Sequence, residues 1–209
     1  MDLEQTRRTL LEATLPHVAF DGWSTAALRA GAADAGLDEA TARNAFPGGP
    51  AEMIEDFSTG IDRRMLAELE TRDLASARVR DRIKTAVRVR LELMTPHREA
   101  VRRALGFLAL PRNVPLATTC LYRTLDAMWY AAGDTATDYN FYTKRLLLAG
   151  VYCPTLLVWL NDRSEGFADT WAFLGRRLDD ALRASGTFGR VAGDLLDLPD
   201  RIFARLARS

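Results

Sequence analysis

The segment STAALRAGAADAGLDEATARNAFPGG (residues 24–49) predicts two short helices separated by a tight turn. Ser24 is suited to cap the first of them, because its hydroxyl can accept a hydrogen bond from a free backbone N–H. Gly36 is suited to end that helix, since glycine readily adopts the left-handed conformation found at helix C-termini. The second helix is expected over residues 38–45, before a Phe-Pro-Gly-Gly turn. With the amphipathic helix that precedes residue 22, the segment predicts a three-helix start.

Helical periodicity continues through the rest of the chain, and Pro50 suits the first turn of a fourth helix. No segment alternates polar and apolar residues between turn signals, so strands are not expected. The composition, 48% hydrophobic and 27% charged, is ordinary for a globular protein. We therefore expect an all-α fold in three parts: a helix-turn-helix region at 1–50, a larger helical domain at 51–185, and a glycine-rich amphipathic C-terminal helix at 186–209.

The three-helix start resembles the N-terminal part of a TetR-type transcriptional regulator, so a ligand-responsive DNA-binding regulator is the alternative function. Residues 1–50 hold four arginines and seven acidic residues, a net charge of −3. The expected recognition helix opens with Asp38 and Glu39 and offers Arg43 alone, whereas DNA binding depends on basic residues that neutralise phosphates. The tyrosine of that helix and the lysine after the Phe-Pro turn, usual in such regulators, are missing. We expect a TetR-like fold whose helix-turn-helix region is vestigial, with no DNA bound.

Basic charge collects in the middle of the chain instead. Between Arg72 and Arg103 there are ten basic and four acidic residues, a net charge of +6. Two interpretations stay open for this segment: a solvated helix face, or a docking surface for an acidic partner or anionic lipid headgroups.

Residues suited to catalysis are scarce. The two histidines, His17 and His97, are not in the spacing of a helical metal site, and His97 follows a proline where an exposed or capping role is expected. No nucleophile elbow, phosphate-binding loop or dinucleotide fingerprint occurs. Cys120 and Cys153 lie in apolar stretches and are interpreted as buried free thiols. Asp134 and Asp138 could form a carboxylate pair, but aspartates in a loop between two helices are more often caps and turn formers. We expect no enzyme, no catalytic residue, no metal and no cofactor.

The densest motif is MWYAAGDTATDYNFYTKRLLLAGVY (residues 128–152), and a second is NDRSEGFADTWAFL (residues 161–174). The first predicts a helix that ends near residue 133, a polar turn, and a new helix that places Tyr142 and Arg145 on neighbouring turns of one side. An arginine whose stem lies on apolar surface is suited to bind a phosphate at the mouth of an apolar pocket. Both motifs resemble the signature of the Coq nine family, with a match that runs roughly over residues 78–184.

This resemblance implies a TetR-like homodimer without enzymatic activity that serves ubiquinone biosynthesis. It implies that residues 51–185 hold an isoprenoid or phospholipid, and that the protein presents a quinone intermediate to the demethoxyubiquinone hydroxylase at the membrane. By position, Arg145 corresponds to the family's headgroup arginine. The full lipid-binding set is Arg145, Tyr142, Trp129 and Leu146, and the partner surface is Met128, Asp138, Tyr139, Phe141 and Tyr142. The family commonly has tryptophan where this chain has Phe141. Packing in the core is the alternative for Trp129 and Tyr142.

The C-terminal segment has apolar residues at helical spacing with arginines between them, a pattern that can lie in a membrane interface. The expected membrane contacts are Phe188, Val191, Leu195, Ile202, Phe203 and Leu206. Three glycines lower helix propensity, so we expect poor order in water; a helix packed on the domain or in a dimer interface is the alternative. The apolar run at 146–160 is too short for a membrane span and predicts a buried helix. The near absence of lysine suggests a GC-rich bacterial genome, and no targeting signal is evident. We expect a cytoplasmic protein peripheral to the inner face of the bacterial plasma membrane.

Overall fold

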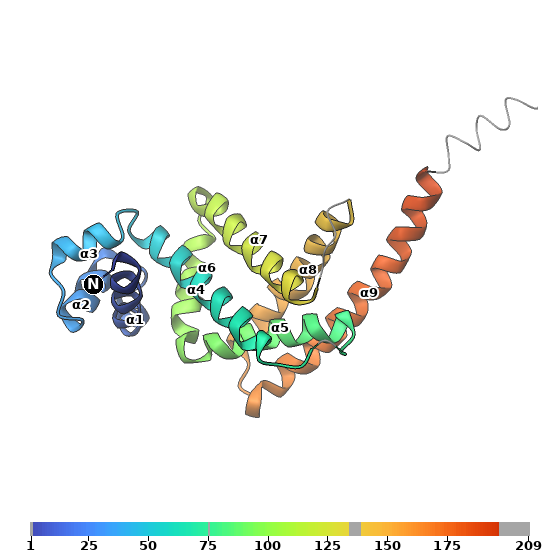
Figure 1. Ribbon diagram of the computed structural model, residues 1–209, viewed down its shortest axis with the longest axis horizontal. Helices are drawn as coiled ribbons and strands as arrows, with labels where there is room; N and C mark the ends of the chain where they lie inside the picture. The colour runs from blue at the N-terminus through green and yellow to red at the C-terminus, as the bar shows by residue number, and fades with distance from the viewer. Residues whose placement is uncertain (1, 75, 134–138, 197–209) are drawn as a thin grey trace, which may run out of the picture. The chain divides into compact units, whose positions relative to one another are not determined.

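The computed structural model describes residues 2–74, 76–133 and 139–196, and within these the side chains of 139–141 and 184–196 are left aside. This part of the chain is helical and contains no β-strand, which confirms the all-α prediction (Figure 1). The chain divides into two compact units, residues 1–137 and residues 138–209, and each is considered by itself. The expected divisions after residues 50 and 185 differ from this one.

The first unit runs from α1 to α7, with two 3-10 turns between the later helices. In chain order its elements are α1 (Leu3–Asp21), α2 (Thr25–Asp34), α3 (Glu39–Ala45), α4 (Pro50–Glu70), α5 (Val79–Met94), η1 (Thr95–His97), α6 (Arg98–Leu108), η2 (Pro111–Asn113) and α7 (Val114–Ala131). The second unit comprises α8 (Tyr139–Asn161), η3 (Glu165–Phe167) and α9 (Ala168–Leu196).

The boundaries of the first helices follow the predicted capping residues. The Ser24 hydroxyl accepts a hydrogen bond from the Ala27 N–H at 3.1 Å, and the Asp38 carboxylate accepts one from the Thr41 N–H at 2.7 Å. Gly36 has a φ of 67°, in the left-handed region that glycine adopts without a Cβ clash. Local sequence therefore determines where α2 and α3 begin and where α2 ends.

Helices α1 and α2 cross at very close range. A methyl group added at Gly31 of α2 would lie 2.7 Å from the Cα of Thr14 in α1, so no side chain fits at this crossing. The corner between the two helices is fastened to α6, because the Trp23 indole N–H donates to the Ala100 carbonyl at 2.9 Å. These contacts fix the three-helix start against one neighbouring helix of the first unit.

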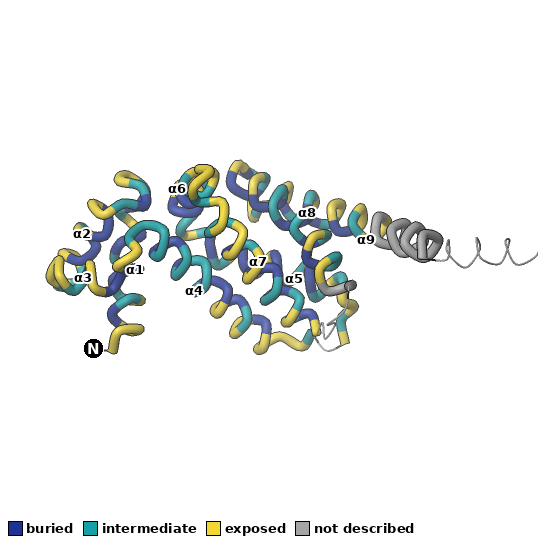
Figure 2. Tube along the Cα trace, turned by 90° about the horizontal axis from the view of Figure 1, so that it is seen from above, coloured by how far each residue is buried: buried dark blue, intermediate teal, exposed yellow. Residues whose placement is uncertain are grey.

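The core of the first unit lies where α4 packs on α5 and α7 (Figure 2). A buried polar network crosses this otherwise apolar interior. The Arg90 guanidinium donates to Asp62 Oδ1 at 2.7 Å and to the hydroxyls of Ser58 and Thr124 at 3.1 Å each. Thr124 in turn donates to Asp62 Oδ2 at 3.0 Å. Arg90 is only 4% exposed, so the prediction of a solvated basic face is wrong for this residue.

In the second unit, α8 packs against α9. Helix α9 continues across Gly186, Gly189 and Gly193 to Leu196, so the expected boundary at residue 185 falls inside a continuous helix. Glycine weakens a helix by about 1 kcal/mol per residue. Adding a residue to a helix that already exists is nevertheless far easier than starting one, and α9 has begun well before these glycines.

Candidate functional site

The predicted residues of α7 lie on two sides of that helix. Met128 is fully buried, at 0% exposure, although it was assigned to a partner surface. The reason is its spacing, since Met128 shares one helix face with the buried Thr124 and Leu125. Trp129, one position further, is half-buried, and Tyr130 is exposed. In this conformation, contact with a partner is open to Tyr130 and closed to Met128.

The predicted lipid-binding residues of α8 also separate. Arg145 is 7% exposed, whereas Tyr142 is 70% exposed and Leu146 is 75% exposed. Tyr142 and Arg145, which the sequence places on neighbouring turns of α8, therefore differ in exposure. Three residues advance the helix by about 300°, a net offset of about 60°, and the border between the buried and exposed faces of α8 falls within that offset.

An apolar stripe, defined as Tyr142, Leu146, Cys153 and Leu157, runs along the exposed side of α8. Its successive members are spaced by four or seven residues, which keeps them on one helix face. Leu157 is exposed, and Cys153 is partly buried. The prediction of a buried helix over residues 146–160 thus holds for one face of α8 and is wrong for the other. An exposed apolar stripe of this kind is typical of a contact surface.

The thiols do not add a reactive group to these helices. Cys120 and Cys153 are both free, and burial raises the pKa of each thiol above its usual value. The thiolate is the nucleophilic form, so a raised pKa lowers reactivity near neutral pH. Cys120 is buried as predicted, whereas Cys153 is only partly so.

Several predicted positions lie outside what the structure describes. Asp134, Asp138, Ile202, Phe203 and Leu206 fall in residues 134–138 and 197–209. Tyr139 and Phe141 belong to the first turn of α8, and Phe188, Val191 and Leu195 belong to α9, but the side chains of these five are not described.

The second sequence motif forms the connection between α8 and α9. Both oxygens of the Asp162 carboxylate accept hydrogen bonds from residues of this turn. Oδ1 accepts from the backbone N–H and the hydroxyl of Ser164, at 2.8 and 2.6 Å. Oδ2 accepts from the backbone N–H and the hydroxyl of Thr170, at 2.9 and 2.5 Å. The Ser164 hydroxyl also accepts a hydrogen bond from the Asp169 N–H at 3.1 Å, in the first turn of α9.

These hydrogen bonds control the ionisation of Asp162. Burial of the carboxyl opposes its ionisation, but the side-chain and backbone donors of Ser164 and Thr170 outweigh that effect and hold the pKa of Asp162 well below its usual range. The sequence motif contains Asp162, but no function or structural role was predicted for it. The spacing Asp-x-Ser, with a threonine eight residues after the aspartate, is the signal that identifies such a turn.

Neither metal chemistry nor a membrane span is indicated within the described residues. Among them, no group of three or more His, Cys, Asp or Glu side chains could hold a metal ion. None of the helices in this portion is long and apolar enough to cross a bilayer. The His17 Nε2–H donates a hydrogen bond to Asp34 Oδ2 at 2.6 Å. His97 is half-buried and occupies the N-cap position of α6, although its side chain makes no capping hydrogen bond, so of the two predicted roles the exposed one does not apply.

Comparison with known proteins relates the chain to one family. The COQ9 family model matches residues 114–185. The chain is 37% identical over 195 residues to the mitochondrial ubiquinone biosynthesis protein COQ9 of Rattus norvegicus, covering 90% of this chain and 62% of the relative. It is 35% identical over 196 residues to COQ9-B of Xenopus laevis, covering 90% of this chain and 67% of the relative. The chain belongs to the COQ9 family.

The COQ9 likeness reaches further along the chain than the two motifs predict. It covers 90% of the sequence, whereas the two motifs predict a match roughly over residues 78–184. Conversely, the chain spans about 62% of the length of the rat COQ9 and 61% of that of Homo sapiens, to which it is 37% identical. COQ9 proteins are non-catalytic accessory proteins of ubiquinone biosynthesis, which agrees with the expectation that the chain is not an enzyme.

A solved structure has the same fold as this chain. The TetR transcriptional regulator from Nitrosomonas europaea superposes with a TM-score of 0.70, covering 84% of this COQ9 chain and 97% of the regulator. The two sequences are 21% identical, so the likeness concerns the fold alone. The prediction of a TetR-like fold is confirmed.

Proposed function

We propose that this COQ9-family chain is a lipid-binding accessory protein of ubiquinone biosynthesis. In this proposal it holds an isoprenoid or phospholipid along α8 and presents a quinone intermediate to the demethoxyubiquinone hydroxylase at a membrane. The observation that carries the proposal is the exposed apolar stripe of α8, which lies in the segment matched by the family model. Family membership supports the pathway, since the relatives are named ubiquinone biosynthesis proteins.

The apolar stripe has the composition that an acyl or prenyl chain requires. Leu146 and Leu157 expose branched aliphatic carbon, and Tyr142 adds an exposed ring with a polar tip. Covering a leucine side chain is worth about 1.5–3 kcal/mol, so a chain laid along two leucines and a tyrosine binds favourably. The proposal assigns the headgroup contact to Arg145, which precedes Leu146 of the stripe and is only 7% exposed; a guanidinium can pair with a phosphate while its stem remains on apolar surface.

Replacing Leu146 with glutamate should reduce co-purified lipid by at least about tenfold, because it removes apolar contact and places a negative charge in the stripe. The measurement is native mass spectrometry of the purified chain, followed by extraction and identification of the bound lipid. Leu182→Glu is the matched control, since Leu182 is exposed on α9 and lies outside the stripe. Equal lipid loading in Leu146→Glu and Leu182→Glu would contradict the proposal.

The same two variants test presentation to the hydroxylase. If lipid and partner share the stripe, co-purification of the hydroxylase should fall in Leu146→Glu and persist in Leu182→Glu. Loss of lipid with full retention of the hydroxylase would assign the stripe to lipid alone. The hydroxylase contact would then be assigned to Trp129, Tyr130 and the start of α8.

Membrane contact is proposed for the C-terminal segment, with the chain acting as a homodimer peripheral to the bilayer. Deleting residues 187–209 should abolish sedimentation with vesicles of phosphatidylglycerol and phosphatidylcholine, because the deletion removes the amphipathic pattern of apolar residues and arginines. Circular dichroism of the shortened chain checks that it is folded. Unchanged sedimentation by a folded, shortened chain would refute the membrane role.

DNA binding is not part of the proposal. At the start of α3, Asp38 caps the helix, and Glu39 forms an ion pair with Arg29 at 3.2 Å, so one of the few arginines of this region already faces a carboxylate. Arg43, which is exposed, is the only basic residue of α3. This charge pattern opposes the approach of a phosphate backbone.

A further inference from the structure

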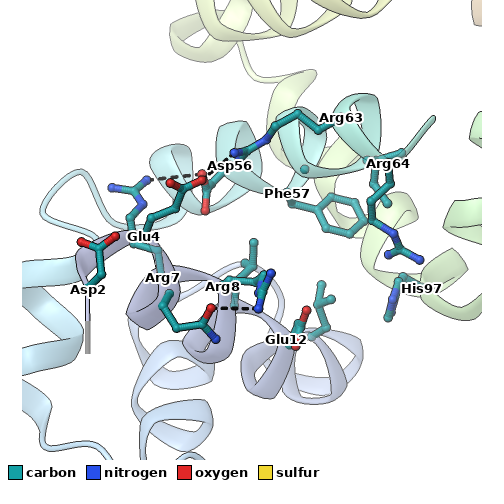
Figure 3. A pocket seen from close by; sticks show the side chains of 15 residues that line it. Asp2, Glu4, Arg7, Arg8, Glu12, Asp56, Phe57, Arg63, Arg64 and His97 are labelled. Carbon is teal, nitrogen blue, oxygen red and sulfur yellow. Dashed lines mark hydrogen bonds and ion pairs between the residues drawn. The ribbon is translucent and has the colours of Figure 1, made fainter. Parts of the chain in front are cut away.

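A cavity of about 620 Å³ lies between α1 and α4, and His97 of η1 closes one end of it (Figure 3). All of its lining residues belong to the first unit, so it is separate from the apolar stripe of α8. Its volume falls within the range of small-molecule sites, roughly 300–1,000 Å³. Figure 3 shows charged side chains of α1 and α4 on both sides of the opening.

The floor of the cavity is apolar. Leu11 and Leu15 of α1 face Phe57 and Ile61 of α4, and these four side chains are largely buried. Gly60 forms part of the α4 wall, and a Cβ added there would meet no atom within 4 Å. At Gly60 the α4 wall of the cavity therefore consists of backbone without a side chain. The space beside it leaves room for the apolar part of a ligand to pack against the ring of Phe57.

Two of the four lining arginines are already neutralised. Arg7 Nη1 lies 2.6 Å from a carboxylate oxygen of Glu52, and Arg63 Nη1 lies 2.8 Å from one of Glu4. A guanidinium held in such a pair gains little from a further anion. Arg7 and Arg63 therefore shape the rim of the cavity without providing a site for a ligand's charge.

The other two arginines, Arg8 and Arg64, have no carboxylate within ion-pair distance among the described residues. Arg8 donates to the neutral amide oxygen of Gln5 at 2.8 Å. Arg64 acts on the half-buried His97: burial and then the positive charge of Arg64 lower the pKa of His97, while the carboxylate of Glu12 acts in the opposite direction. Arg8, Arg64 and His97 thus lie toward one end of the cavity with Glu12 as the opposing charge, whereas the lining carboxylates of Asp2, Glu4 and Asp56 lie toward the end that holds Arg7 (Figure 3).

We propose that this cavity binds a small amphiphilic carboxylate. Arg8 and Arg64 hold the carboxylate, and Leu11, Phe57 and Ile61 receive the apolar body. One negative charge fits better than two, because the acidic Glu12 faces the same space. The guanidinium fork matches the two oxygens of a carboxylate. This ligand site is additional to the proposed lipid site and does not depend on it.

Histidine ring NMR of the full chain provides a local test, because the chain has only two histidines and His17 does not line the cavity. Sodium octanoate should shift the ring signals of His97 saturably and raise the pKa of His97, since a nearby negative charge favours the protonated ring. The signals of His17, held by Asp34, should stay in place. Octanol, which has the same chain and no charge, should bind at least about fivefold more weakly than octanoate.

Four variants distinguish a specific binding site from nonspecific hydrophobic binding. Gly60→Leu should abolish the octanoate-dependent shift by filling the cavity, whereas Gly106→Leu, at an equally open helical glycine outside the lining, should leave it unchanged. Arg64→Gln should weaken octanoate about fivefold, and Glu12→Gln should tighten it by a similar factor. Thermal unfolding followed by circular dichroism confirms that each variant is folded.

Octanol as effective as octanoate, unaltered binding in Gly60→Leu, or weaker binding in Glu12→Gln would each overturn the proposal. Because every readout is at His97, lipid bound along α8 does not affect the interpretation.

Discussion

Replacing Asp62 with alanine is expected to lower the free energy of unfolding by about 3–5 kcal/mol, because it leaves the charge of Arg90 buried without its carboxylate. Arg90 and Asp62 are both nearly inaccessible to water, and their atoms lie 2.7 Å apart. Thr124 would also lose the acceptor of its hydroxyl proton. Urea denaturation followed by circular dichroism measures the change as a shift of the transition midpoint.

The double variant Asp62→Leu with Arg90→Met is the control for this prediction. It removes both charges and keeps apolar volume, so most of the lost stability should return, as is usual when a buried ion pair is replaced as a whole. The coupling between the two sites, obtained from a double-mutant cycle, should then be at least about 2 kcal/mol. A double variant as unstable as Asp62→Ala would show that packing, and not the uncompensated charge, determines the effect.

Replacing Asp162 with alanine should be nearly as damaging, at about 2–4 kcal/mol, because four donors of the α8–α9 turn lose a charged acceptor. Thr170 is buried, so its N–H and hydroxyl cannot turn to water instead. Thermal unfolding followed by circular dichroism measures the change as a shift of the melting temperature, because the helical signal is lost when the chain unfolds. Asp169→Asn, at an exposed carboxylate of the same turn, should change stability by less than about 0.5 kcal/mol.

Acid should reproduce part of the Asp162→Ala effect. Because the pKa of Asp162 is lower in the folded chain than in an unfolded one, its ionised form stabilises the fold fully above the unfolded value of about 4. That contribution is lost as the pH falls through the lower folded-state pKa. The wild-type chain should therefore lose stability below about pH 4 more steeply than Asp162→Asn. Parallel pH profiles for the two chains would assign the acid sensitivity to other carboxylates.

The parts of the fold that follow from neighbouring residues were predictable from the sequence. Ser24 and Asp38 cap helices through donors three residues away, and Gly36 ends α2 through its own backbone freedom. Such interactions leave a local pattern, so the three-helix start and the all-α class were recognised. The face that each helix buries was predicted less well. In α8 the residues are apolar on both sides, and periodicity cannot then distinguish the exposed Leu146 from the buried Leu148.

The parts of the fold and of the candidate site that could not be predicted depend on residues that are distant along the chain. Asp62 and Arg90 are separated by 28 positions and meet only because α4 packs on α5. The charge pattern predicted a solvated basic segment, and nothing local marks Arg90 as the arginine that turns inward. The α1–α4 cavity draws on Arg8, Phe57 and His97, which lie in three separate elements. Asp162 was locally detectable but required recognition of a turn and not of a catalytic motif.

The attachment of the α1–α2 corner to α6 has a consequence for hydrogen exchange. Trp23 holds that corner through the Ala100 carbonyl, and Arg103 donates to the Ala19 carbonyl at 3.1 Å, while the side of α1 that faces α4 borders a cavity. A segment fastened along one edge and bordered by empty space on another can open without disturbing the rest of the domain. We expect the amides of α1 to α3 to exchange as one cooperative group, through an opening that costs less free energy than global unfolding. We expect those of α4, α5 and α7, which surround the Asp62–Arg90 network, to exchange only when the whole unit unfolds.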